Sequence, residues 1–172
     1  FDQRPTSPYF LFGQAELHRA QLLYGVNAPW SEIDYSLHRA RQAFNDVLEL
    51  VDRRFPQGSP PWIEMRSEVL FSQGTVFFLL GDLAVADEIN RERERLQPRS
   101  YPADQLQGAI DYTRGQTNNI GGTTEAELPP RPTEGISGER FLAYAIEIGK
   151  ALFGRWGTVA GMVVEDLYKA AQ

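Results

Sequence analysis

Histidines are the first side chains to consider for catalysis, and this chain has only two, His18 and His38. Each stands beside an arginine in a polar stretch of a predicted helix. A catalytic or metal-binding role would need acids or further histidines close by. The sequence contains neither an H-E-x-x-H nor an E-x-x-H spacing. We therefore interpret both histidines as surface or partner-contact residues, and we predict no catalytic residue and no metal ligand.

Other groups with chemical potential are weaker candidates still. The carboxylate pairs Glu64/Glu68 and Asp87/Glu88 are typical of solvated helix faces. The segment 118–124 could turn backbone N–H groups towards a phosphate, but it lacks the Lys-Ser/Thr ending and the preceding strand of a phosphate-binding loop. The chain has no cysteine, which excludes disulfides, thiol nucleophiles and thiolate zinc sites. We predict a protein that is not an enzyme and has no cofactor.

The composition is that of a globular domain. Of the 172 residues, 42% are hydrophobic and 12% are aromatic, enough to build a core without metals or disulfides. The net charge of −6 argues against a nucleic-acid partner, because phosphate recognition needs clustered Lys and Arg. We expect protein partners instead.

No segment is predicted to cross a membrane. The apolar run 151–164 is interrupted by Arg155 and is shorter than the roughly 20 residues that a bilayer requires. Peripheral association with a membrane stays open. Because the chain begins at Phe1 rather than Met, we expect a processed or trimmed chain and favour an extracytoplasmic, periplasmic location.

Apolar residues recur at spacings of three and four along most of the chain, which predicts helices. We expect an extended arm at residues 1–8 and a helical region over 9–114. A long irregular loop should follow at 115–138. A C-terminal helix or helix pair, kinked near Gly154 and Gly157, should occupy 139–172 and pack on the same domain. Within the helical region, the expected helices are 9–24, 31–51, 62–80, 82–96 and 102–114.

Residues 67–98 carry the most specific pattern. Two apolar helices flank a Gly-Asp turn, with small and large residues alternating at fixed places. This pattern resembles a tetratricopeptide repeat (TPR), a helix-turn-helix of roughly 34 residues whose small residues sit at the helix crossing. The resemblance implies packing roles for six residues: Leu70, Gly74, Phe77, Gly81, Ala86 and Pro98.

A weaker copy of the same pattern spans about 13–55, with an insertion near 25–30. Two positions of the clear repeat depart from the family, since Asn90 replaces a large apolar residue and Arg93 a small one. The run 91–95, with its alternating charges, is then predicted to be a solvated face. Because stacked repeats usually need about three units, helices after Tyr101 should supply the missing packing. We predict an all-α fold of TPR-like stacked hairpins with a non-TPR C-terminal helical extension.

The resemblance implies a non-catalytic scaffold for protein–protein interaction, either an adaptor or an accessory or structural subunit of a larger complex, and membrane association of that complex stays open. In the family, the first helix of each repeat lines a concave groove that binds a peptide or helix, which implies exposed partner-binding positions at Arg66, Gln73 and Thr75.

Aromatic residues near the two ends of the chain allow two interpretations. The cluster Tyr9, Phe10 and Phe12 and the residue Trp156 could pack in the core or dock onto a partner. The alternative function, from another class, is an exported helical solute- or ligand-binding protein associated with a transport system. That function predicts a closed apolar pocket.

Overall fold

The computed structural model describes residues 7–98, 101–117, 119–120, 122–136 and 138–153. Among these residues, α-helices dominate, so the prediction of an all-α fold is confirmed. The elements in chain order are α1 (Ser7–Gly25), α2 (Trp30–Arg54), α3 (Pro60–Leu79), α4 (Leu83–Leu96), α5 (Tyr101–Thr113), β1 (Asn119–Ile120), β2 (Thr123–Thr124), a 3-10 turn (Glu125–Glu127) and α6 (Glu139–Phe153).

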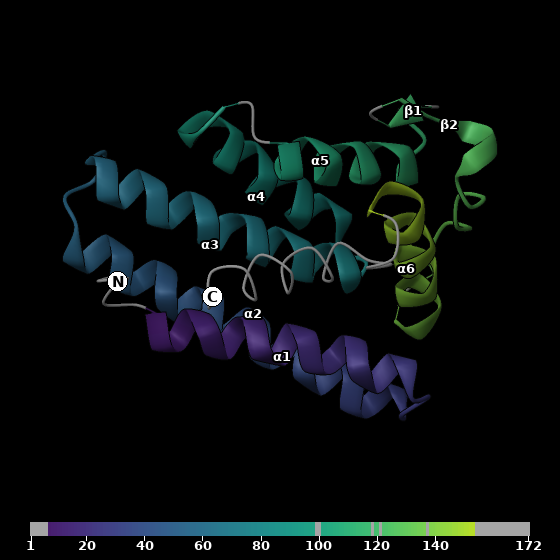
Figure 1. Ribbon diagram of the computed structural model, residues 1–172, viewed down its shortest axis with the longest axis horizontal. Helices are drawn as coiled ribbons and strands as arrows, with labels where there is room; N and C mark the ends of the chain where they lie inside the picture. The colour runs from purple at the N-terminus through teal and green to yellow at the C-terminus, as the bar shows by residue number, and fades with distance from the viewer. Residues whose placement is uncertain (1–6, 99–100, 118, 121, 137, 154–172) are drawn as a thin grey trace.

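The helices stack as antiparallel hairpins (Figure 1). Helices α1 and α2 form the first hairpin, which lies at one end of the stack. Helix α3 packs on α2 and pairs with α4, and α5 packs on α4. Helix α6 runs across the end of this stack and contacts α3, where Phe141 meets Phe78 edge-to-face at a ring separation of 5.7 Å. The core therefore lies between the hairpins and under α6.

The turn between α3 and α4 forms as the sequence predicts. Gly81 has a φ of 84°, a conformation that costs other residues energy. The N–H groups of Gly81 and Asp82 donate to the carbonyls of Phe78 and Phe77 at 3.0 and 2.9 Å, which satisfies the end of α3. The Asp82 side chain then accepts from Val85 N at 3.4 Å and caps α4.

Gly74 lies where α3, α4 and α5 meet. A methyl group added at Gly74 would lie 3.4 Å from Leu106 of α5 and 3.5 Å from Ile89 of α4. Ala86 and Leu70 are buried, Phe77 is half-buried, and Pro98 follows the end of α4. A side chain larger than alanine at position 74 would therefore overlap α4 and α5.

The prediction of a solvated face at 91–95 is wrong for Arg93, which is buried and donates to the carbonyl of Gln97 at 2.9 Å. Asn90 is buried as well and donates to Gln107 of α5 at 2.9 Å. At position 90 the contact between α4 and α5 is thus a hydrogen bond where the repeat pattern would place an apolar residue. Sequence periodicity could not show this, because a polar residue can be buried once it has a partner.

Helix α1 begins at Ser7, so residues 7–8 of the predicted arm are helical; Pro8 is tolerated because a helix's first N–H groups have no internal partner. Residues 1–6 lie outside the described residues, as do Trp156 and the predicted kink near Gly154 and Gly157.

The segment 115–138 is less irregular than predicted, because its described part contains the β1–β2 hairpin and the 3-10 turn. Arg131 links this segment to α5 through hydrogen bonds and a ring contact. Its guanidinium donates to the carbonyls of Tyr112 and Thr117 at 2.8 and 2.7 Å and lies 4.4 Å over the Tyr112 ring. Ile120 is buried as well.

Candidate interaction surface

Helix α1 carries apolar residues on every side, with polar residues scattered among them, although it lies at the edge of the stack. Its buried side faces the core through Phe10, Leu17 and Ala20. Helix α3 also carries apolar residues on most sides, but α2, α4, α5 and α6 pack against it. A helix that is apolar around its whole circumference is normally enclosed by protein. In α1, by contrast, part of that surface faces solvent.

The outward side of α1 carries a row of apolar residues that is interrupted by the partly buried His18. Leu11 is 46% exposed and Leu22 is 57% exposed, and Ala15 is exposed between them. These residues share one helix face, because their spacings of four and seven are close to whole turns. Leu11, Ala15 and Leu22 are called the α1 row below.

A second exposed feature lies between α1 and α2. It is a groove of about 480 Å³ that opens to solvent. Its α1 wall is apolar and aromatic, and its α2 wall is mostly polar. We call it the edge groove; it is lined by Pro8, Tyr9, Phe12, Arg39, Gln42, Ala43 and Asp46.

Arg39 is the best-positioned side chain of the edge groove. Its guanidinium carbon lies 5.0 Å from the centre of the Phe12 ring and 5.4 Å from that of Tyr35. Its Nε is 3.7 Å from a carboxylate oxygen of Glu16, which is almost buried. Cation–π contacts and this ion pair hold Arg39 in place, while 41% of its side chain stays exposed.

The N-terminal aromatic cluster divides between the two interpretations. Phe10 is buried against Phe44, with 5.8 Å between ring centres. Tyr9 and Phe12 point the other way and are 53% and 42% exposed. Phe10 is therefore part of the core, whereas Tyr9 and Phe12 line the edge groove.

No family model, curated protein or solved structure matches this chain. The resemblance to TPR proteins consequently remains a prediction from the residues quoted above.

The three groove positions taken from that resemblance are not exposed as expected. Thr75 is fully buried and donates to the carbonyl of Phe71 at 2.9 Å. Gln73 is buried and donates to Asn45 of α2. Both expectations of exposure are wrong, because neighbouring helices pack directly over this side of α3.

Arg66 also differs from the expectation, since its side chain is only 17% exposed. It makes ion pairs with Asp52 of α2 and Glu92 of α4 at 3.0 and 2.9 Å and lies 5.4 Å from the Trp62 ring. The guanidinium thus ties three helices together.

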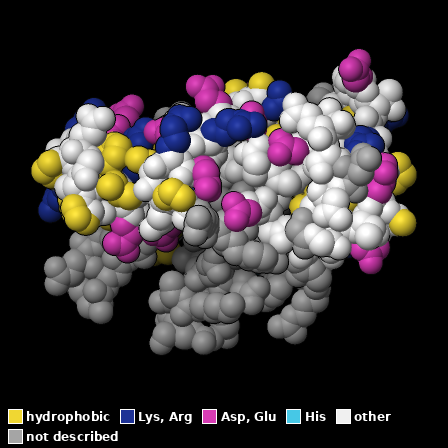
Figure 2. Space-filling view, turned by 90° about the horizontal axis from the view of Figure 1, so that it is seen from above, with side chains coloured by type: hydrophobic (Ala, Val, Ile, Leu, Met, Phe, Trp, Pro, Cys, Tyr) yellow, Lys and Arg dark blue, Asp and Glu magenta, His cyan; other side chains and the backbone are white. Residues whose placement is uncertain are grey.

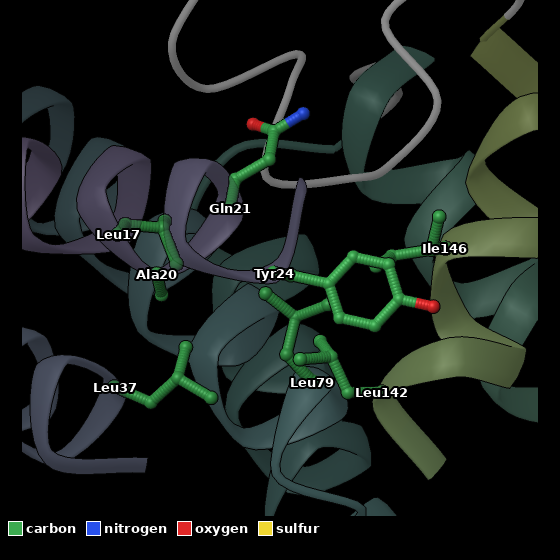
Figure 3. Close-up of a pocket in the computed structure, with 8 residues that line it drawn as sticks. All are labelled: Leu17, Ala20, Gln21, Tyr24, Leu37, Leu79, Leu142 and Ile146. Atoms are coloured by element: carbon green, nitrogen blue, oxygen red, sulfur yellow. The ribbon is translucent and has the colours of Figure 1, made fainter. Parts of the chain in front are cut away.

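The apolar pocket under α6 is shown in Figure 3, where Leu79 and Leu142 face each other below the Tyr24 ring. Its space for a water-sized sphere is about 10 Å³, close to the minimum for a single water molecule. This pocket is too small for a solute. Leu17, Ala20, Gln21, Tyr24, Leu37, Leu79, Leu142 and Ile146 line it.

Polar residues join α4 to α5. Asp87 accepts from Arg91 at 3.0 Å and from Gln107, and it pairs with Arg114 at 3.2 Å. Burial alone would raise the pKa of Asp87, but these hydrogen bonds and arginine charges lower it below 3.8. Asp87 is therefore a link between helices rather than part of a solvated face.

Basic and acidic side chains are interspersed on the face shown in Figure 2.

The histidines lie apart from any cluster of acids. His38 is exposed and pairs with Asp34 at 3.4 Å, and His18 is partly buried in α1. Within the described ranges, no three His, Asp or Glu side chains converge in a way that could hold a metal ion.

No helix in the described part of the chain combines the length and apolar character needed to cross a membrane.

Sequence reasoning missed Leu11, Leu22 and Tyr35 as surface residues, and it treated Arg39 only as part of a polar face. A usable signal did exist. The apolar residues of α1 outnumber those needed for one buried face, and Tyr35 shares a face of α2 with Arg39, one turn away. Which of the apolar faces of α1 meets the core depends on the neighbouring hairpin.

Proposed function

We propose that this protein is a non-catalytic interaction scaffold, an adaptor or accessory subunit, that binds a helix of another protein along the α1 row. The observation that supports this proposal is the mismatch between α1's composition and its position. It carries apolar residues on every side, as an enclosed helix does, yet Leu11 and Leu22 remain about half exposed.

A matching partner would present an amphipathic helix. Apolar residues at spacings of three, four and seven are the usual means by which one helix binds another. Covering the exposed parts of Leu11 and Leu22 would contribute roughly 1 kcal/mol per residue. Because the chain carries a net charge of −6, a partner with basic residues beside its apolar stripe would associate faster.

The alternative of a solute-binding protein receives less support. A ligand site usually encloses several hundred cubic ångströms, whereas the apolar pocket under α6 has room for about 10 Å³. The edge groove is larger but open, with a charged wall. Neither feature is the closed apolar pocket that this alternative predicts.

The test is site-specific photo-cross-linking in cells of the protein's source. A photoreactive phenylalanine analogue is placed at Leu11 or at Leu22, and a matched control is placed at Arg95, which is exposed on α4. We expect cross-links from the two α1 positions to one protein, mapping to an amphipathic helix of that protein, and none to it from position 95.

A second arm uses Leu22→Lys, which should abolish the cross-link from position 11 without lowering the melting temperature. Glu88→Lys, a change at an exposed site on α4, should leave it intact. Equal cross-linking from positions 11, 22 and 95, or none from the α1 positions, would contradict the proposed role of the α1 row.

A further inference from the structure

One face of α2 carries a regular series of exposed and half-exposed side chains that is distinct from the α1 row. Residues at alternating spacings of three and four fall on the same side of a helix. Helix α2 meets α3 through other residues, such as Asn45 and Asp52. The series is called the α2 stripe and comprises Glu32, Tyr35, Arg39, Gln42, Asp46, Glu49 and Arg53.

Four charges of the α2 stripe, seven residues apart, alternate in sign along the helix, while a fifth, Glu49, lies between the last two and pairs with Arg53 of its own chain at 3.4 Å. Glu32 is negative, Arg39 positive, Asp46 negative and Arg53 positive, with about two turns between successive charges. Read in the opposite direction, these four charges have the opposite sign at every step, and Glu49 falls opposite the uncharged Tyr35. The stripe is therefore complementary to a second copy of itself laid antiparallel.

A two-fold axis near Gln42 would place these opposite charges against each other in the two copies. Glu32 of one copy would face Arg53 of the second copy, and Arg39 would face Asp46. Because a two-fold interface repeats each contact in both directions, four attractive charge pairs would form. A parallel arrangement in register would instead place each charge against its like.

The edge groove gives this arrangement room and an apolar border. Ala43, a small residue, lies between Gln42 and the α1 wall, and Tyr9 and Phe12 supply aromatic surface beside it. Arg39 is already held between Phe12 and Tyr35, so little side-chain freedom would be lost on pairing. Asp46 is exposed and accepts from Gln42 at 3.0 Å.

We infer that a second copy of this chain occupies the edge groove, forming an antiparallel two-fold dimer through the α2 stripe. This interface uses a different face from the α1 row, so a partner protein could bind each copy at the same time. The dimer and the proposed scaffold function can therefore fail separately.

Charge reversal tests the pairing directly, with sedimentation equilibrium of the full chain as the measurement. Asp46→Arg alone would place Arg against Arg39 of the second copy, and Arg39→Glu alone would place Glu against Asp46. Each single variant should dimerise about tenfold more weakly or worse. An equimolar mixture of the two should recover dimers, since the mixed pair restores opposite charges at both contacts.

Arg39 also contacts residues of its own chain, so its variant could fail to fold. A second pair, Glu32→Arg and Arg53→Glu, repeats the design at exposed positions. Circular dichroism and thermal melting show whether each variant is folded. Glu88→Arg, on α4, makes the same charge change as Glu32→Arg away from the groove and should leave dimerisation unchanged.

Three results would overturn the inference. The first is a wild-type chain that stays monomeric up to about 100 μM. The second is dimerisation of the single variants with wild-type affinity. The third is a mixture of complementary variants that stays as weak as its components. Because cross-linking from the α1 row is measured separately, a monomeric chain that still cross-links its partner would refute only the dimer.

Discussion

Gly13 of α1 packs directly against the Phe44 ring of α2, and replacing it with alanine should destabilise the fold. A Cβ at this position would lie 2.6 Å from Cε1 and 2.9 Å from Cδ1 of the Phe44 ring. Carbon atoms in good contact are about 3.5–4.0 Å apart, so the overlap is about 1 Å. Phe44 is fully buried and cannot move its ring into solvent.

Two opposing effects set the magnitude. Overpacking a core position costs about 1–3 kcal/mol, while replacing a helical glycine by alanine gains about 1 kcal/mol. We expect Gly13→Ala to lower the free energy of unfolding by about 1 kcal/mol, which for a chain of this size lowers the melting temperature by about 3 °C.

Gly25 provides the matched control, because it ends the same helix and a Cβ there would meet nothing within 4 Å. Gly25→Ala should leave stability unchanged or raise it slightly. Chemical denaturation and thermal melting measure both variants. If Gly13→Ala stabilised the protein as much as Gly25→Ala, the tight α1–α2 packing described here would be wrong. Adding Phe44→Leu to Gly13→Ala should remove the overlap and give a positive coupling in a double-mutant cycle.

Two pH-dependent predictions concern buried links. The pKa of Asp87 is lowered, so its hydrogen bonds with Gln107 and Arg91 stabilise the fold fully above pH 3.8, and this contribution is lost as pH falls through the lower folded-state pKa. Asp87→Asn should cost about 1 kcal/mol of unfolding free energy at pH 7 and make stability depend less on pH in the acid range. An unchanged acid dependence of stability would refute this. Burial raises the pKa of Tyr144 to about 12, although its hydroxyl contacts Thr113. Stability that is present below pH 10 should therefore fall as pH rises through 12. The melting temperature of Tyr144→Phe should fall less at alkaline pH than that of the wild type, and an equal fall would count against the buried phenol.

The helical elements were predictable because their signals are local. Spacings of three and four identified every described helix, and Gly81-Asp82 fixed the α3–α4 turn through a backbone conformation that glycine adopts easily. The boundaries were less certain, since Ser7 and Pro60 begin α1 and α3 two residues before the predicted starts. Prolines at helix starts leave this choice open, because they suit both a first turn and a preceding extended segment.

The candidate surfaces were only partly predictable. Tyr9 and Phe12 were proposed as contact residues, and the structure leaves them exposed; Phe10, in the same cluster, is in the core. Three neighbouring aromatics have the same chemistry, and only the direction from which α2 packs separates them. Arg66 illustrates the same limit, because its acidic neighbours come from two other helices.

The sequence by itself determined the all-α class, the hairpin at 67–98 and the absence of cysteine chemistry, since these depend on residue type and short-range spacing. Tertiary structure decided which polar residues are buried and which apolar residues remain outside. Gln73, Thr75 and Arg93 are covered because neighbouring groups supply their hydrogen-bond partners. Leu11 and Leu22 remain exposed because α1 lies at the end of the stack, where no described helix covers that side of it.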